Sequence, residues 1–259
     1  MTSPNAPPTR EVLDAVVAAL VSQAGGYLRN PVRRSGVTCA VCTTPSDGAM
    51  FCGPCWGHRR TPGVADLVCA LTYVFGGTQS GYLMRLYKGQ TPQEQHQVVL
   101  AALMFLGGSL HSGCAERIVG RPFTHWSFVP SLPAKQGEHP FRRFASRAAR
   151  GLEVPLRAAQ QASNPRMLSV EHFQAAATLP PGSHVLLMDD TWTQGGHAQS
   201  AALALRTAGA GKVSIMVAAR WINPGYGTNQ DFIRTHLTSD FNPRICPWTE
   251  GLCPAPTTP

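Results

Sequence analysis

Residues 185–209 read VLLMDDTWTQGGHAQSAALALRTAG, and this stretch contains the pattern that decides the fold. Residues 185–188 form a continuous apolar run, which is typical of a central parallel strand buried on both faces. Residues 197–208 follow with the apolar spacing of a helix. Gly195 and Gly196 lie between the two segments and allow a tight turn there. The stretch therefore predicts a strand, a turn and a helix in direct succession.

The same alternation of strands and helices extends along most of the chain. Short apolar runs predict five strands, at residues 65–75, 125–130, 153–156, 184–188 and 212–221. Amphipathic spacing predicts five helices, from Thr9 to about residue 24, from Thr91 to about Ile118, and at residues 139–150, 197–208 and 231–237. Strands that alternate with helices indicate an α/β fold with a mostly parallel sheet and flanking helices.

Length and composition indicate one main domain with a small appendage. The chain has 259 residues, of which 43% are apolar and 14% are charged, so it is long enough to bury a core. Residues 1–28 are predicted to be a disordered, proline-rich lead followed by a helix. Residues 29–62 are rich in cysteine, glycine and arginine and form a candidate small module, and residues 63–259 form the main α/β domain.

The balance of charge and apolar segments bears on partners and location. A formal net charge of +8 favours phosphate-bearing partners, such as nucleotides or nucleic acid. The first residues lack the basic and apolar segments of a secretory signal. The apolar run at residues 98–108 is shorter than the roughly 18 to 20 residues that span a membrane. We therefore expect a cytoplasmic protein with no membrane partner.

Two acids, Asp189 and Asp190, follow the apolar run of the predicted strand. In open α/β sheets, ligands bind outside the carboxyl ends of the strands, where loops and helix N-termini converge. The glycine turn and the N-terminus of the next helix suit an anion such as phosphate. The carboxylates suit neutral hydroxyl groups or a hydrated magnesium ion. The alternative is that the two acids only end a strand and open a turn.

The segment VLLMDDTWTQGG resembles the loop that binds phosphoribosyl pyrophosphate (PRPP) in type I phosphoribosyltransferases. The resemblance implies that Asp189 and Asp190 hold the ribose hydroxyls and are the catalytic carboxylates. Gln194 and His197 stand where that family usually has small hydroxyl residues. The residues implied to surround the 5-phosphate are Thr191, Thr193, Gln194, Gly195, Gly196 and His197.

This resemblance also implies a reaction. A nitrogenous base or amine would attack C1 of PRPP, and pyrophosphate would leave with magnesium. A loop after the strand SFVP would bind the pyrophosphate, with the candidates Ser131, Lys135, Arg142 and Arg143. Residues 160–168 would cover the site, with Arg166 reaching into it. Lys88 is a further candidate cation, and Trp221 is a candidate for stacking on the acceptor base.

Four cysteines, Cys39, Cys42, Cys52 and Cys55, have the spacing C-x2-C-x9-C-x2-C. Two such knuckles bring four thiolates into a tetrahedron around zinc, and a closed site of this kind is structural. Two disulfides and an iron–sulfur cluster are the alternatives. Four other cysteines lie elsewhere: Cys69 and Cys114 fall in apolar runs and are interpreted as buried small residues, whereas Cys246 and Cys253 either pair or hold a metal with another ligand.

A four-cysteine module ahead of a phosphoribosyltransferase-like domain resembles the ComF family, which is associated with DNA uptake. Residues 127–143 lack the arginine-rich stretch usual in that family. A second hypothesis is that the chain binds nucleic acid and uses the sugar-phosphate pocket without catalysis. Five arginines around the cysteines would then form a basic rim: Arg29, Arg33, Arg34, Arg59 and Arg60.

Overall fold

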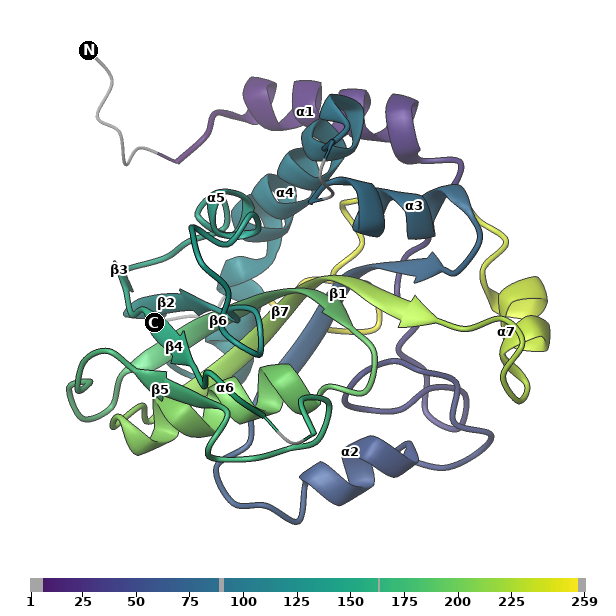
Figure 1. Cartoon of the computed structure of the whole chain (residues 1–259). Helices are drawn as coiled ribbons and strands as arrows, with labels where there is room; N and C mark the ends of the chain where they lie inside the picture. The colour runs from purple at the N-terminus through teal and green to yellow at the C-terminus, as the bar shows by residue number, and fades with distance from the viewer. Residues whose placement is uncertain (1–6, 89–90, 163, 256–259) are drawn as a thin grey trace.

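The computed structural model describes residues 7–88, 91–162 and 164–255 (Figure 1). Its centre is a five-stranded sheet with the order β1-β7-β6-β2-β3, in which every pairing is parallel. A separate antiparallel hairpin consists of β4 and β5. The predicted α/β fold with a mostly parallel sheet is confirmed. The strands are β1 (Leu67–Phe75), β2 (His125–Phe128), β3 (Leu152–Glu153), β4 (Leu156–Ala158), β5 (Phe173–Ala175), β6 (His184–Trp192) and β7 (Lys212–Ile222).

Helices cover both faces of the sheet. The helices are α1 (Arg10–Ala24), α2 (Gly53–His58), α3 (Gln79–Leu86), α4 (Glu94–Val119), α5 (Arg142–Ala145), α6 (Gly196–Thr207) and α7 (Asn229–His236). Figure 1 shows α1, α3, α4 and α5 on one side of the sheet and α6 and α2 on the other. Along β6, Leu186 and Met188 pack towards α4, whereas Val185 and Leu187 pack towards α6. This strand is therefore buried on both faces, as its unbroken apolar run predicts.

Helix α4 contains the apolar run at residues 98–108 but is much longer, with 26 residues. By length and mean hydropathy, 1.7 over its best window, it is the one helix of the described residues that could span a membrane, and 61% of that window is buried inside the protein. A Cβ atom at Gly108 would lie 2.4 Å from Cα of Ala148, so this glycine lets the chain pass close to α4. The helix is thus enclosed by the protein's own core.

Local signals placed some helix ends correctly and others wrongly. Thr9 caps α1 by accepting a hydrogen bond from the Val12 amide, as predicted. The predicted N-cap at Thr91 is wrong, because Gln93 stays extended and its amide donates to the Leu86 carbonyl, so the helix begins only at Glu94. The predicted helix at residues 139–150 is also mostly wrong. Only Arg142–Ala145 is helical, and tight turns with amide-to-carbonyl bonds three residues apart follow it.

The single strand predicted at residues 153–156 is wrong: β3 and β4 are two short strands in different sheets, and they are separated by Val154 and by Pro155, which has no amide hydrogen to donate to a strand pairing. Three further elements were not predicted from the sequence: α2, α3 and the strand β5. Each is short or polar, so its apolar periodicity is weak. The predicted disordered lead, residues 1–8, lies largely outside the described residues.

The cysteine-rich segment packs directly on the sheet. Three of its cysteines belong to the core on the α6 side, and the Tyr73 hydroxyl of β1 donates to the Thr43 carbonyl over 2.6 Å. The Tyr73 amide also donates to the Arg29 carbonyl over 2.8 Å. Residues 29–62 therefore share a continuous core with the α/β unit.

Candidate functional site

Strand β6 carries the acid pair towards the carboxyl edge of the sheet. The strand runs on to Trp192, so Asp189 and Asp190 lie within its last residues and not after its end. Strand β6 is flanked by β2 and β7, with Phe128 opposite Met188 and Arg220 opposite Trp192. The pair therefore lies in the middle of the sheet, where loops from neighbouring strands meet.

A cavity of about 150 Å³ lies at the turn that follows β6. One wall is Arg166, which the covering segment at residues 160–168 contributes, and Ser163 of that segment is outside the described residues. The sequence predicted that this segment covers the turn, and Arg166 does lie against it. The remaining lining residues are Asp189, Thr191, Trp192, Thr193, Gln194, Gly195, Gly196, His197 and Ala198.

The glycines shape this turn. Gly195 has a φ of 87°, and a Cβ atom there would lie 2.1 Å from the Trp192 ring. A Cβ atom at Gly196 would lie 2.0 Å from the Arg166 carbonyl oxygen. Gly195 thus permits the left-handed turn into α6, and Gly196 permits the approach of the covering segment. The first-turn amides of α6 carry partial positive charge beside the cavity.

A buried arginine donates hydrogen bonds to the backbone of this turn. Arg220 on β7 is 6% exposed, and its Nη1 atom donates to the carbonyls of Trp192, Thr193 and Trp221 at 2.7–2.8 Å. Arg220 was not among the site residues predicted from the sequence. Its only signal was a charge inside an otherwise apolar strand pattern, and a charge at such a position is buried only where acceptors surround it.

Two polar atoms beside the cavity lack partners among the described residues. They are Nε1 of Trp192 and Nε2 of His197, and both are buried. Burial lowers the pKa of His197, so its ring is neutral at pH 7. The neutral ring is a weaker partner for phosphate than the charged form would be. Trp192 was not among the predicted site residues.

Asp190 is bound by two residues from the end of α3. The Tyr87 hydroxyl donates to its Oδ2 atom over 2.6 Å, and the Lys88 ammonium forms an ion pair with the same oxygen. Burial alone would raise the pKa of Asp190, but the Lys88 charge and these hydrogen bonds lower it below its usual value. Lys88, the further candidate cation, is therefore part of the site, and Tyr87 is an addition to it.

The pKa of Asp189 is shifted in the opposite direction from that of Asp190. Asp189 is half-buried and lines the small cavity. Burial, and then the neighbouring Asp190 charge, raise its pKa well above the usual value. The two adjacent carboxylates therefore differ: Asp190 is held ionised by Lys88, and Asp189 has an excess affinity for a proton or a cation.

A second cavity, of about 1180 Å³, lies beside the acid pair and is lined by Lys88. Ser131, Lys135 and Arg142 also line it, so the structure brings three of the predicted pyrophosphate-loop residues together there. Arg142 does not offer a free charge, because Glu153 and then Glu138 bind its guanidinium and raise its pKa. Arg143 does not line the cavity and stacks on the Phe144 ring at 4.7 Å.

Trp221, the candidate for stacking on the acceptor base, packs against other parts of the protein. The Trp221 ring lies against the turn after β1, 3.3 Å from a Cβ atom placed at Gly76, with the Arg85 guanidinium 5.2 Å from its centre. It packs between these groups and is not an open platform for a base.

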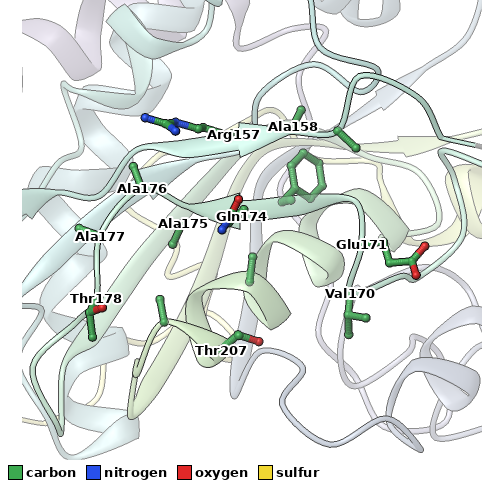
Figure 2. A pocket seen from close by; sticks show the side chains of 14 residues that line it. Arg157, Ala158, Val170, Glu171, Gln174, Ala175, Ala176, Ala177, Thr178 and Thr207 are labelled. Atoms are coloured by element: carbon green, nitrogen blue, oxygen red, sulfur yellow. The ribbon is translucent and has the colours of Figure 1, made fainter.

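A further groove of about 680 Å³, between the β4–β5 hairpin and the end of α6, contains no predicted site residue (Figure 2).

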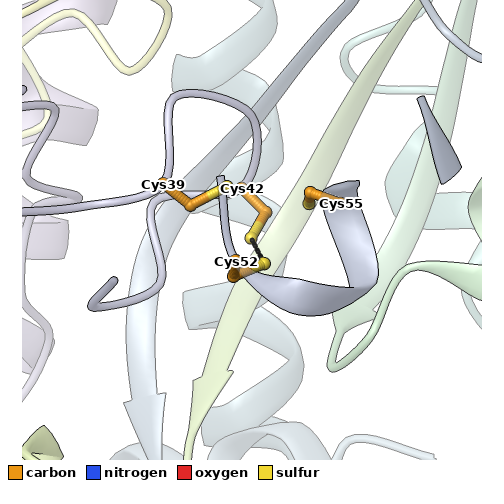
Figure 3. A group of neighbouring side chains, drawn as sticks. All are labelled: Cys39, Cys42, Cys52 and Cys55. Carbon is orange, nitrogen blue, oxygen red and sulfur yellow. Dashed lines mark hydrogen bonds between the residues drawn. The ribbon is translucent and has the colours of Figure 1, made fainter. Parts of the chain in front are cut away.

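The four predicted zinc ligands form a cluster (Figure 3). The sulfur atoms of Cys39, Cys42, Cys52 and Cys55 all lie within 4.8 Å of one another, and Cys42 and Cys52 are 3.7 Å apart. Sulfur atoms on one tetrahedral zinc ion, with bonds of about 2.3 Å, are about 3.8 Å apart. The cluster therefore fits a zinc ion, and its four filled positions fit a structural role.

The arginines near this cluster do not form one basic rim. Arg33 donates to the carbonyls of Pro247, Ala40 and Val68, and burial lowers its pKa. Arg29 donates to the carbonyls of Leu237, Gly26 and Leu28. The guanidinium groups of both residues are occupied by backbone acceptors, and Arg29 also lies 3.9 Å from Asp240. Three of the five remain exposed: Arg34, Arg59 and Arg60.

These features define an α/β protein with a ligand-sized site at the carboxyl edge of a parallel sheet and a four-cysteine cluster that packs against the same sheet. No family model matches this chain, and no curated protein matches its sequence.

Proposed function

We propose that the chain is a PRPP-binding phosphoribosyltransferase of the ComF-like kind, located in the cytoplasm. The observation that carries the proposal is the small cavity after β6, because the acid Asp189, the glycine turn, the N-terminus of α6 and Arg166 all line it. An acid beside an anion-binding turn matches a ribose 5-phosphate, which has vicinal hydroxyls next to a phosphate.

The proposed roles follow from the contacts. The 5-phosphate would accept hydrogen bonds from the turn at residues 193–197, and Arg166 would close over it. Asp189 and the free oxygen of Asp190 would accept from the ribose hydroxyls. Magnesium bound together with PRPP would neutralise the pyrophosphate. A cation near Asp189 would also lower the raised pKa of this carboxyl group towards its usual value.

The larger cavity would hold the pyrophosphate and the acceptor. Lys88 and Lys135 are its candidate cations. As a base or amine attacks C1, the bond from C1 to the pyrophosphate oxygen breaks and negative charge grows on the leaving group. Cations fixed beside that oxygen would stabilise the charge, and catalysis would consist mainly of positioning and charge stabilisation.

The test is calorimetric titration of the full chain with PRPP and magnesium, followed by measurement of pyrophosphate release with pooled bases and amines. We expect saturable binding that Asp189→Asn weakens at least tenfold, with Asp47→Asn as a control at an acid that does not line the cavity. Binding without release would indicate a ligand-sensing protein. No binding, or equal binding by the Asp189 variant, would refute the proposal.

A second candidate function, nucleic-acid binding, is favoured by one surface. On and beside α2, the Phe51 and Trp56 rings stack with centres 6.3 Å apart, and Trp56 is 56% exposed. Arg59 lies 4.6 Å from the Phe51 ring centre and Arg60 lies 5.9 Å from that of Trp56. An exposed ring that stacks on a half-buried one and is flanked by arginines suits the bases and phosphates of a single strand.

This candidate predicts salt-sensitive retention of a single-stranded oligonucleotide. The variant Arg59→Ala/Arg60→Ala should weaken binding several-fold and reduce its salt dependence, whereas Arg147→Ala, an exposed arginine elsewhere, should not. Equal loss in both variants would mean only a general charge effect.

A further inference from the structure

A second group of metal-binding side chains lies at the far end of α4. His111 and Cys114 belong to this helix, whereas Cys246 and Cys253 belong to the segment after α7. One ligand atom from each residue lies within 4.8 Å of all the others. From the sequence, Cys114 was predicted to be a buried small residue, and the partner of Cys246 and Cys253 stayed open. No local pattern joins these residues, because His111 and Cys253 are 142 positions apart.

We propose that His111, Cys114, Cys246 and Cys253 bind a second, structural zinc ion. His111 and Cys114 are three residues apart on a helix, so their side chains lie on one face. Cys246 and Cys253 flank a turn that is closed by a hydrogen bond from the Cys246 amide to the Gly251 carbonyl, at 2.9 Å. Each half of the site is thus preformed by local structure.

The histidine is oriented as a zinc ligand. Its Nε2 atom lies 2.8 Å from the Pro243 carbonyl oxygen. A carbonyl only accepts hydrogen bonds, so Nε2 carries the proton and Nδ1 keeps its lone pair. Nδ1 lies 3.5 Å from the Cys253 sulfur. With bonds of about 2.0 Å to nitrogen and about 2.3 Å to sulfur, two such ligands on one tetrahedral zinc ion are about 3.5 Å apart.

Burial and charge also fit a closed zinc site. His111, Cys114 and Cys246 are at most 3% exposed, whereas Cys253 is exposed and closes the site from the solvent side. Three thiolates and a neutral imidazole around Zn²⁺ have a net charge of −1. Arg117 follows Cys114 by three residues on α4, and its guanidinium donates to the Cys114 sulfur over 3.4 Å. The positive charge of this guanidinium offsets the net negative charge of the site. A single disulfide would leave one thiol and the His111 lone pair without a partner.

The ion would fasten the C-terminal segment to the core. Residues 238–255 form no helix or strand within the described part of the chain. The segment nevertheless touches the N-terminal region: the Phe241 amide donates to the Gly25 carbonyl over 3.0 Å, and Arg33 donates to the Pro247 carbonyl over 2.9 Å. Metal binding can supply the folding energy that such an irregular segment lacks.

The test is the metal content of the full chain, purified under reducing conditions without chelators. We expect two zinc ions per chain, and one in Cys253→Ser, which removes an exposed ligand and preserves the core. Cys69→Ala is the matched control, because Cys69 is buried and belongs to neither cluster, and it should retain two. One zinc ion in both the wild-type protein and the Cys253 variant would overturn the proposal.

A second variant keeps the test decisive if Cys253→Ser fails to fold. His111→Cys retains four ligands and should still bind two metal ions. With cobalt in place of zinc, its thiolate-to-metal absorption should rise, because seven thiolates become eight. Unchanged cobalt spectra, or a disulfide between Cys246 and Cys253 in the wild-type protein purified under reducing conditions, would contradict a metal at this site.

Discussion

The Tyr87 hydroxyl donates a hydrogen bond to the Asp190 carboxylate over 2.6 Å, and the two residues are 103 positions apart in the chain. Lys88, the next residue, forms an ion pair with the same oxygen. The end of α3 therefore lowers the pKa of Asp190, whereas Asp189, whose pKa is raised, is the acid that lines the small cavity.

Replacing each acid by its amide should affect the free energy of unfolding differently. Asp190→Asn removes the partner of Lys88, and we expect a loss of about 1 to 2 kcal/mol in the free energy of unfolding. Asp189→Asn removes the repulsion between neighbouring carboxylates and should leave stability unchanged or raise it. Denaturant unfolding at pH 7 checks both. Equal destabilisation by the two variants would contradict the assigned difference.

The same pair predicts a pH dependence. The pKa of Asp190 is lowered in the folded state, so its contribution is present above about pH 4, the pKa of an unfolded aspartate, and is lost as the pH falls further. The stability gap between wild type and Asp190→Asn should therefore shrink below pH 4. The pKa of Asp189 is raised, so wild type should lose stability relative to Asp189→Asn as the pH rises from 4 to 7. Unfolding curves across this range measure both slopes.

Alanine at Gly195 should be more damaging than alanine at most glycines. It would place a side chain in the left-handed region and against the Trp192 ring. We expect a loss of about 1 to 3 kcal/mol and weaker PRPP binding. Gly225→Ala is a suitable control, because Gly225 is not at positive φ and its nearest neighbour would be 3.7 Å away. Thermal melts and calorimetry distinguish the two variants.

Arg220 should be required for the shape of the turn. Arg220→Met keeps much of the side-chain volume but removes the Nη1 donor from the three backbone carbonyls that accept from it. Each buried acceptor left unpaired costs about 1 kcal/mol or more. We expect lower thermal stability together with weaker PRPP binding. A variant that binds PRPP as tightly as wild type would show that Arg220 does not position the turn.

Removal of zinc from the four-cysteine cluster should loosen the sheet as well as the module. Cys39, Cys42 and Cys55 are part of the core on the α6 side, together with strands β1, β6 and β7. Cys52→Ser, at the most accessible ligand, should release one zinc ion and lower the melting temperature of the whole chain in one transition. Two separate transitions would indicate an independent module.

The sequence by itself determined the features that depend on neighbouring residues. The apolar run before Asp189, the glycine turn and the periodicity of residues 197–208 are local, and they gave β6, its turn and α6 correctly. The spacing of Cys39, Cys42, Cys52 and Cys55 is also local, since each knuckle is four residues long.

Only the tertiary structure decided which distant groups meet. Parallel strands require long crossovers, so residues that are adjacent at the edge of the sheet come from remote segments. For this reason Lys88 forms an ion pair with Asp190, and Glu153 accepts hydrogen bonds from the Arg142 guanidinium. For the same reason His111 and Cys114 lie beside two cysteines near the C-terminus. Charge and residue type are visible in the sequence, but whether a charge is free, paired or buried depends on packing between segments that no local pattern describes.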